Sequence, residues 1–183
     1  MSPAPFPTTT VFELREVHKV PFYSQFTDIT AVDWRKKSCG IASLAMVIGY
    51  YKQEAISVDA VLAQGIAAHG YIENVGWTYK SLISVARSYG LQGNSYDLAK
   101  LSADDALLVF KIFLQNGPLV ASVHYKFDPA STIPHLVVVT GTDGNTLYYN
   151  DPAAKEGGRK IAMNDFIKAW KKRFIELQPE TTD

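Results

Sequence analysis

The sequence has a single cysteine, Cys39, among its 183 residues. One thiol excludes both an intramolecular disulfide and a thiolate metal cluster, because each of these needs a second sulfur. The four histidines are scattered along the chain and lack a paired ligand spacing such as H-x-x-x-H. We therefore expect no metal site and no cofactor, which leaves the lone thiol as the chemically notable group.

The sequence also has no excess of charge of either sign and no long hydrophobic run. Its 18 Lys and Arg residues balance 18 Asp and Glu residues, so it offers no electrostatic footprint for a phosphate backbone or an acidic membrane surface. No uncharged stretch exceeds the fourteen residues from Ser38 to Tyr51, whereas a helix needs roughly 20 to span a bilayer. We expect neither a nucleic-acid partner nor a membrane span.

A signal peptide is not visible either, because no basic residue near the N-terminus precedes an apolar stretch. The sequence as written fits a cytoplasmic protein, and an exported protein would look the same after removal of its signal. A lone thiol is compatible with both compartments. The sequence therefore leaves the compartment open.

The composition is that of a globular protein, with 47% hydrophobic and 20% charged residues. A chain of this length is typical of one domain of roughly 100 to 200 residues. We expect an extended lead-in over residues 1–19, a single domain over residues 20–178, a tail over residues 179–183, and a monomer.

Helix patterns precede strand patterns along the chain, which favours an α+β fold with an antiparallel sheet over a βαβ array. The first helix is apolar on all sides after a predicted Ser38 cap, as expected of a helix through the centre of a small domain. Capping residues, glycine stops and stretches rich in Val, Thr and Tyr predict the other elements. The predicted helices are 38–51, 57–70, 78–89, 102–115 and 164–172, and the predicted strands are 119–125, 135–141, 146–151 and 174–177.

The turn between two of these strands decides which residues share a face of the sheet. Residues 143–145 are predicted to form a three-residue hairpin turn that pairs Thr142 with Thr146. The register that follows makes His135 and Asp151 diagonal neighbours on one face, roughly 7 Å apart between backbones. A two-residue turn would place them on opposite faces.

Cys39 is the first candidate for chemistry. A lone cysteine among small apolar residues is most often a buried hydrophobic residue. Here it lies at the predicted start of the central helix, where free N–H groups and the helix dipole stabilise a thiolate and lower its pKa below about 8.5. This position predicts a nucleophile.

A thiolate nucleophile needs a base, and His135 is the best placed of the four histidines, because it begins the most apolar predicted strand at the sheet's edge. His124 could face either side of its strand, whereas His18 and His69 are expected on the solvated surface. Asp151 lies at the far end of the paired strand and is the candidate to orient the imidazole. An Asp-Pro pair is by itself typical of a plain turn.

Four sequence strings carry a resemblance to a known family. They are VPFYSQ at 20–25, SCGIASLAM at 38–46, HLVVVTG at 135–141 and YNDP at 149–152. In this order, with a hairpin between the last two, they resemble the papain-like cysteine peptidases related to bacteriocin-processing, double-glycine leader peptidases. The resemblance spans residues 20–177 and implies a papain-like fold, in which the central helix that carries the cysteine packs on a C-terminal antiparallel sheet.

The resemblance also implies roles for individual residues. Cys39 would be the nucleophile, His135 the general base and acid, and Asp151 the orienting carboxylate. Gln25 would donate to the oxyanion hole, where an amide N–H₂ placed before the helix can act together with the Cys39 backbone N–H.

Gly76 and Trp77 fall where papain-like enzymes place one wall of the substrate groove, so the resemblance implies that they contact a peptide or protein substrate. A core tryptophan ahead of a helix is the alternative interpretation of Trp77. The transporter part of the leader peptidases is absent from this sequence, so the resemblance does not fix the substrate.

The leading hypothesis is a thiol peptidase that cleaves a peptide or amide bond through an acyl-enzyme intermediate. A catalytically silent domain that binds an extended peptide is one alternative, and an acyltransferase or peptide ligase on the same triad is another. The complete Cys, His and Asp set favours an enzyme. Hydrolysis and transfer share their first half-reaction, so the sequence does not separate them.

Overall fold

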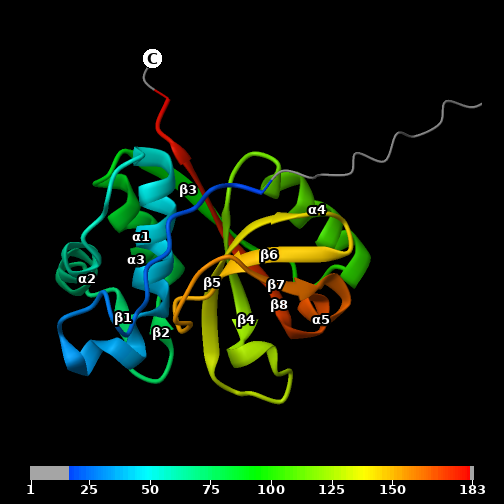
Figure 1. Cartoon of the computed structure of the whole chain (residues 1–183), viewed down its shortest axis with the longest axis horizontal. Coiled ribbons are helices and arrows are strands. Elements are labelled where there is room, and N and C mark those ends of the chain that lie inside the picture. Colours follow the sequence, from blue (N-terminus) through cyan, green and yellow to red (C-terminus); the bar gives the residue numbers. More distant parts are fainter. Residues whose placement is uncertain (1–16, 182–183) are drawn as a thin grey trace, which may run out of the picture.

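The helices and strands below come from a computed structural model that describes residues 17–181, so residues 1–16 of the predicted lead-in and 182–183 of the predicted tail lie outside it (Figure 1). The helices are α1 (Cys39–Lys52), α2 (Val58–Ala67), α3 (Tyr79–Arg87), α4 (Ala103–Leu114) and α5 (Met163–Ala169), with 3-10 turns η1 (Val32–Lys37) and η2 (Tyr125–Phe127). The strands are β1 (Tyr71–Ile72), β2 (Gly76–Trp77), β3 (Leu91–Asp97), β4 (Leu119–His124), β5 (Pro134–Thr142), β6 (Thr146–Asn150), β7 (Arg159–Ala162) and β8 (Trp170–Pro179).

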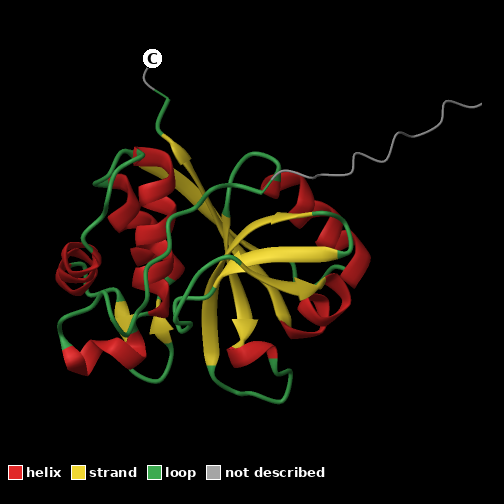
Figure 2. Cartoon of the chain, in the orientation of Figure 1, coloured by secondary structure: helices red, strands yellow, loops and turns green. Residues whose placement is uncertain are grey.

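An antiparallel sheet with the strand order β3-β8-β4-β5-β6-β7 separates two groups of helices. α1, α2 and α3 lie on one side of the sheet, and α4 and α5 lie on the other (Figure 2). The small β1–β2 hairpin lies near the N-terminal end of α1 (Figure 1). Helices on an antiparallel sheet confirm the predicted α+β class.

Side-chain caps start three helices as predicted. The hydroxyls of Ser57, Thr78 and Ser102 each accept the backbone N–H three residues further on. The predicted cap at Ser38 is wrong, because this hydroxyl donates to the Trp34 carbonyl oxygen at 2.8 Å and makes no cap bond. The first N–H groups of α1 are therefore not occupied by a capping side chain.

Several strands escaped prediction because they are short or polar. β3 has the sequence LQGNSYD and is largely exposed, so it lacks the alternation of a half-buried strand, yet it pairs with β8 along its whole length. β1, β2 and β7 are two to four residues long. The predicted last helix is too long at its end, since α5 ends at Ala169 and Trp170 begins β8.

The turn of the β5–β6 hairpin differs from the prediction. The Asp143 N–H donates to the Thr146 carbonyl oxygen at 3.1 Å, which encloses a two-residue turn. Thr142 consequently pairs with Leu147. The predicted three-residue turn, with Thr142 opposite Thr146, is wrong.

A β-bulge restores the alignment that the turn would otherwise have shifted. The register changes by one residue around Thr140, so that Val138 pairs with Asn150 further along the hairpin. If the pairing of Val138 with Asn150 is continued by one more residue pair, Asp151 takes the same position opposite β5 that the three-residue turn had predicted. His135 and Asp151 therefore meet on one face despite the shorter turn.

Alternate residues of the central strands feed two hydrophobic cores, one on each face of the sheet. In β5, Val138 packs with α1, α2 and α3, whereas Val137 and Val139 pack with α4 and α5. The second core contains an aromatic cluster in which Phe110 contacts Phe166, Trp170 and Phe174 at ring-centroid distances of 4.8 to 5.6 Å. The cluster ties α4 and α5 to the beginning of β8.

Truncation of Phe110 is expected to be strongly destabilising, because its side chain is fully buried within this cluster. Phe110→Ala should lower the free energy of unfolding by about 3 to 5 kcal/mol, measured by chemical denaturation. Leu108→Ala on the same helix is the matched control, since Leu108 is 61% exposed, and should change it by less than about 0.5 kcal/mol. Equal effects of the two substitutions would contradict the packing described here.

Candidate active site

Cys39 is the first residue of α1 and is half-buried. The chain enters this helix through η1, and the Ser38 bond to Trp34 holds the junction. The free N–H groups and the positive end of the helix dipole therefore lie beside the sulfur, as the sequence predicted.

His135 lies near the start of β5 with 4% of its side chain exposed. Its Nε2 atom is 2.7 Å from Oδ1 of Asp151, so the predicted imidazole and carboxylate are in contact. The Tyr125 ring packs edge-on against the imidazole, with ring centroids 5.2 Å apart. Because Nε2 is engaged by the carboxylate, Nδ1 is the ring nitrogen left to face Cys39.

Asp151 follows the last residue of β6 and is held in place from its own chain. Its Oδ1 atom also accepts the Ala153 N–H at 2.8 Å. The neighbouring Asn150 points elsewhere: its amide donates to the Val20 carbonyl oxygen, and its Oδ1 accepts the Gly158 N–H at 2.8 Å. Asp151, and not Asn150, is therefore the group that holds the imidazole.

The thiol and the imidazole shift each other's pKa. Burial raises the pKa of the Cys39 thiol, but a hydrogen bond from His135, its positive charge and the N–H groups of Leu136 and Gly40 lower it below its ordinary value overall. Burial likewise lowers the pKa of His135, but its bonds to Asp151 and Cys39 raise it to about 9. These shifts favour a thiolate beside an imidazolium at neutral pH.

The Asp151 carboxylate is the third member of the site, and its pKa favours the charged form. Burial raises the pKa of Asp151, whereas its hydrogen bond to His135, the charge of that ring and the Ala153 N–H lower it overall. A charged carboxylate in turn stabilises the imidazolium. The structure thus brings together three of the predicted site residues in the order thiol, imidazole, carboxylate.

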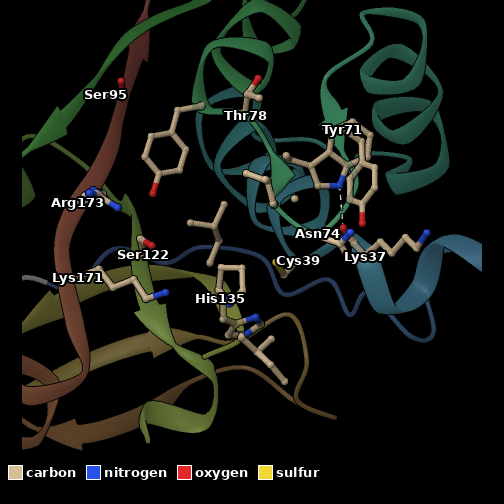
Figure 3. Close-up of a pocket in the computed structure, with 18 of the residues that line it drawn as sticks. Lys37, Cys39, Tyr71, Asn74, Thr78, Ser95, Ser122, His135, Lys171 and Arg173 are labelled. Carbon is tan, nitrogen blue, oxygen red and sulfur yellow. Dashed lines mark hydrogen bonds between the residues drawn. The ribbon is translucent and has the colours of Figure 1, made fainter. Parts of the chain in front are cut away.

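A groove of roughly 970 Å³ runs past the sulfur and the imidazole. Figure 3 shows Cys39 and His135 with Lys37, Tyr71 and Asn74 to one side of them. Ser122, Lys171 and Arg173 lie to the other side in the same view. An open groove that crosses a reactive group is suited to an extended substrate.

Gly76 and Trp77, for which the resemblance implied a place on the groove wall, line this groove. Gly76 has φ +100° with open space beside it, a backbone conformation that favours glycine. Trp77 is also a core residue, since it is 6% exposed and its indole N–H donates to the Lys37 carbonyl oxygen at 2.8 Å. The two interpretations of Trp77 are therefore compatible.

Gln25 lies between the Asp151 loop and the segment that leads to Cys39. Its backbone N–H donates to the Pro152 carbonyl oxygen at 2.8 Å, and its side-chain amide donates to the Arg35 carbonyl oxygen at 2.8 Å. The side chain is buried, and its Oε1 atom has no partner within residues 17–181. Gln25 is not among the residues that line the groove.

Two of the other three histidines have side-chain hydrogen bonds within the fold. His18 is not the solvated residue that the sequence suggested, because its ring bonds to the Leu114 carbonyl oxygen and to the Tyr50 hydroxyl. His124 bonds to the Ser131 carbonyl oxygen, and His69 is exposed. Over residues 17–181, no group of three His, Cys, Asp or Glu side chains could hold a metal ion.

Apart from Gly76 and Trp77, sequence reasoning missed the residues of the groove that lie outside the four family-like strings. Tyr79 and Ser122 occur in a helix and a strand that read as ordinary packing elements. Lys171 and Arg173 were placed at and beyond the end of a predicted helix, where basic residues are typical and signal no site. Tyr125 follows a predicted strand, and its ring contact with His135 depends on the turn η2.

The fold and the geometry of this site define a class of protein, that of the cysteine peptidase fold. A model of the Peptidase_C39 like family matches residues 17–174. The chain therefore belongs to the peptidase C39-like family, within the papain-like α+β fold that the sequence predicted. A search of the curated proteins finds no match.

Solved structures agree with this assignment. A double glycine motif protease from an AMS/PCAT transporter, in complex with the leader peptide, is 26% identical with a TM-score of 0.62, over 90% of this chain and 95% of that one. A putative C39-like peptidase from Bacillus anthracis is 18% identical with a TM-score of 0.60, over 93% and 100%. The peptidase domain of Streptococcus ComA, a bifunctional ABC transporter, is 18% identical with a TM-score of 0.57, over 79% and 93%. The two structures at 18% identity support the fold alone.

The described residues include no helix that is both long and apolar enough to cross a membrane.

The mutual pKa shifts predict how the thiol reacts at different pH values. The rate of Cys39 alkylation by iodoacetamide should persist well below pH 8.5, the ordinary thiol pKa, because His135 holds the sulfur as a thiolate. In His135→Ala, burial becomes the main influence and the reaction should need a pH above about 8.5. The protein has one thiol, so intact mass reports this site alone.

His124→Ala is the control for this experiment, since His124 is bonded to Ser131, and it should retain the wild-type profile. A profile in His135→Ala that matches the wild type would show that the imidazole does not control the thiol.

Proposed function

We propose that the protein is a cysteine peptidase that hydrolyses a peptide bond through an acyl-enzyme intermediate. The observation that carries the proposal is the hydrogen-bonded series of Cys39, His135 and Asp151 beside an open groove. Nucleophilic catalysis by a thiol needs this set: a sulfur with a lowered pKa, a base within reach and a group that orients the base.

In the acylation step, the Cys39 sulfur attacks the carbonyl carbon of the scissile bond. An S–C bond forms, and the carbonyl oxygen takes the negative charge. The His135 imidazolium then donates its Nδ1 proton to the leaving nitrogen as the C–N bond breaks, so the amine departs neutral. The product on the enzyme is a thioester.

In the deacylation step, the now neutral His135 accepts a proton from a water molecule whose oxygen attacks the thioester carbonyl carbon. The C–S bond breaks, the acid product leaves, and the thiolate and imidazolium are restored. Asp151 moves no proton in either step: it fixes Nε2 and stabilises the charge that returns to the ring.

We assign the oxyanion hole to the backbone N–H of Cys39 and the side-chain amide of Gln25. The Arg35 carbonyl oxygen occupies one N–H of that amide and leaves the second available.

A peptide substrate is supported by the relative in complex with a leader peptide, which is 26% identical to this chain. Gly76 and Trp77 lie on the groove wall, where they would contact the substrate backbone and side chains.

Loss of the thiol should abolish turnover and leave the fold intact. We expect Cys39→Ala to reduce the cleavage of a diverse synthetic peptide pool by roughly 10⁶-fold, below detection by mass spectrometry, with unchanged circular dichroism. Cleavage by this variant at the wild-type rate would rule out a thiol mechanism. If the wild type produces new C-termini joined to an amine, where hydrolysis would leave a free acid, the protein is an acyltransferase. If the wild type binds peptides without cutting them, the protein is a catalytically silent domain.

Substitutions at Asp151 and at the adjacent Asn150 should have different effects: the first should lower the rate of cleavage, and the second should lower the stability of the fold. Asp151→Asn removes the charge that supports the imidazolium, so kcat/KM should fall, but by less than the roughly 10² to 10⁴-fold that proton transfer contributes. Asn150→Ala should leave the pH profile of kcat/KM unchanged and lower the free energy of unfolding by about 1 to 3 kcal/mol, because it unpairs the Gly158 N–H and the Val20 carbonyl oxygen. The reverse pattern would assign the orienting role to Asn150.

A further inference from the structure

Positive charge dominates the groove that passes Cys39. Among its lining residues, Lys36, Lys37, Lys171 and Arg173 are basic, and Asp97 is acidic. The ammonium of Lys37 is 3.2 Å from the Glu73 carboxylate and over the Tyr71 ring, so the charge of Lys37 is compensated. Lys36 precedes it on the turn η1 and is exposed. The charges of Lys171 and Arg173 at the other end need a separate explanation.

An irregular stretch of β8 places these two basic side chains side by side. The β4–β8 register jumps between Ser122, which pairs with Arg173, and Val123, which pairs with Trp170. Lys172 within this bulge has φ +54°. Bulges of this kind re-aim side chains next to functional sites, and Figure 3 shows Lys171 and Arg173 on the same side of the groove as Ser122.

The bulge is held from three directions. The Trp170 indole N–H donates to the Arg173 carbonyl oxygen at 3.1 Å, and the Leu98 N–H donates to the Lys172 carbonyl oxygen at 2.8 Å. The Lys172 ammonium donates to the Leu101 carbonyl oxygen at 2.7 Å. Lys171 and Arg173 are thus presented by a fixed backbone, which is a requirement for a specific subsite.

Two hydroxyls lie beside these cations. Tyr79 and Ser122 both line the groove, and their side chains are hydrogen-bonded to each other. Both residues line the same groove as Cys39 and His135. This end of the groove is therefore within reach of a substrate bound at the sulfur.

The charges at this end do not cancel. Arg173 is fixed by Asp97, with Nε 2.8 Å from Oδ2, while the guanidinium keeps its other N–H donors. Lys171 forms no ion pair with any described residue. Burial, and then the charge of Arg173, lower the pKa of its ammonium. Two cations against one carboxylate leave one positive charge without a partner.

We propose that Lys171, Arg173, Tyr79 and Ser122 form a subsite that binds a carboxylate of the substrate next to the scissile bond. The inference deepens the proposed function and rests on it for the peptide nature of the substrate. One uncompensated cation matches the single charge of a carboxylate better than the double charge of a phosphate. The carboxylate is an Asp or Glu side chain or the C-terminus of a peptide, and the two sources are separated below.

The test uses three bromoacetyl amino acids that alkylate Cys39, with displacement of bromide, and therefore does not require turnover. Bromoacetyl-glutamic acid amide carries a side-chain carboxylate, bromoacetyl-glutamine carries a terminal carboxylate, and bromoacetyl-glutamine amide carries neither. On the wild-type protein, the reagent with the matching carboxylate should react about tenfold faster than the uncharged amide, as expected of one charge-assisted hydrogen bond in a partly exposed site. Added salt should reduce the ratio.

Substitutions locate the source of this preference. Lys171→Gln with Arg173→Gln should bring the ratio close to one, and Lys171→Arg should keep it. Lys160→Gln on β7 is the control for net charge, because Lys160 is exposed and does not line the groove, and should leave the ratio unchanged. The imidazolium of His135 attracts anions equally in all these variants, so the difference isolates the subsite.

Peptide cleavage separates this inference from the proposed function. With the peptide pool, the wild type should favour cleavage sites that carry an acidic residue, or a free C-terminus, at one fixed position, and the double variant should lose that preference. Cleavage without an acidic preference, together with an alkylation ratio that the double variant does not change, would overturn the subsite and leave the peptidase standing. A ratio that depends on Lys171 and Arg173 in a protein that cleaves no peptide would overturn the peptidase and leave an anion-binding groove.

Discussion

The contact between the start of α1 and the start of β5 is the constraint on which the rest of the site depends. Ser43 on α1 donates to the Leu136 carbonyl oxygen at 3.3 Å, while the Leu136 N–H bonds the Cys39 sulfur. A Cβ atom on Gly40 would come within 3.2 Å of the side chains of Leu136 on β5 and Leu82 on α3, so the start of α1 is tightly packed against both elements. The thiol and the imidazole come from segments almost a hundred residues apart, and this packing brings them together.

Burial of a charged pair is expensive unless hydrogen bonds satisfy both partners. Here the sulfur has two backbone N–H groups and the imidazole, and the imidazole has the carboxylate of Asp151. Each group therefore lowers the cost of ionising the next, and the pKa directions of the three side chains agree with one another. The same logic explains why Asn150 is not interchangeable with Asp151: it serves the fold by holding the segment at Val20 and the loop at Gly158.

The sequence predicted the elements that local chemistry specifies. Caps at Ser57, Thr78 and Ser102, and the apolar run of α1, are local signals, and the structure confirms them. The contact between His135 and Asp151 was predicted through a wrong turn, and it holds because the bulge at Thr140 makes up the missing residue. Such a bulge depends on pairing with distant strands and leaves no local pattern.

Other features escaped prediction for the same reason. β3 is polar and irregular, and it becomes a strand only because β8 offers it an edge to pair with. Lys171 and Arg173 looked like a basic helix end, and only the β4–β8 register brings them to the groove. Even the position of Gln25 depends on two backbone carbonyls from other segments. Residues that are positioned by tertiary contacts are also those that would differ in role between one member of a fold class and another.

The central claim is that a thiolate and an imidazolium coexist at neutral pH in the resting protein. The most direct measurement is nitrogen NMR of the His135 ring in protein labelled with ¹⁵N-histidine, assigned by comparison with His135→Ala and followed from pH 6 to pH 10. Both ring nitrogens should carry a proton at neutral pH, and one proton should be lost near pH 9, because Asp151 and Cys39 raise the pKa of His135 to about 9. A ring with a single protonated nitrogen throughout this range would contradict the central claim.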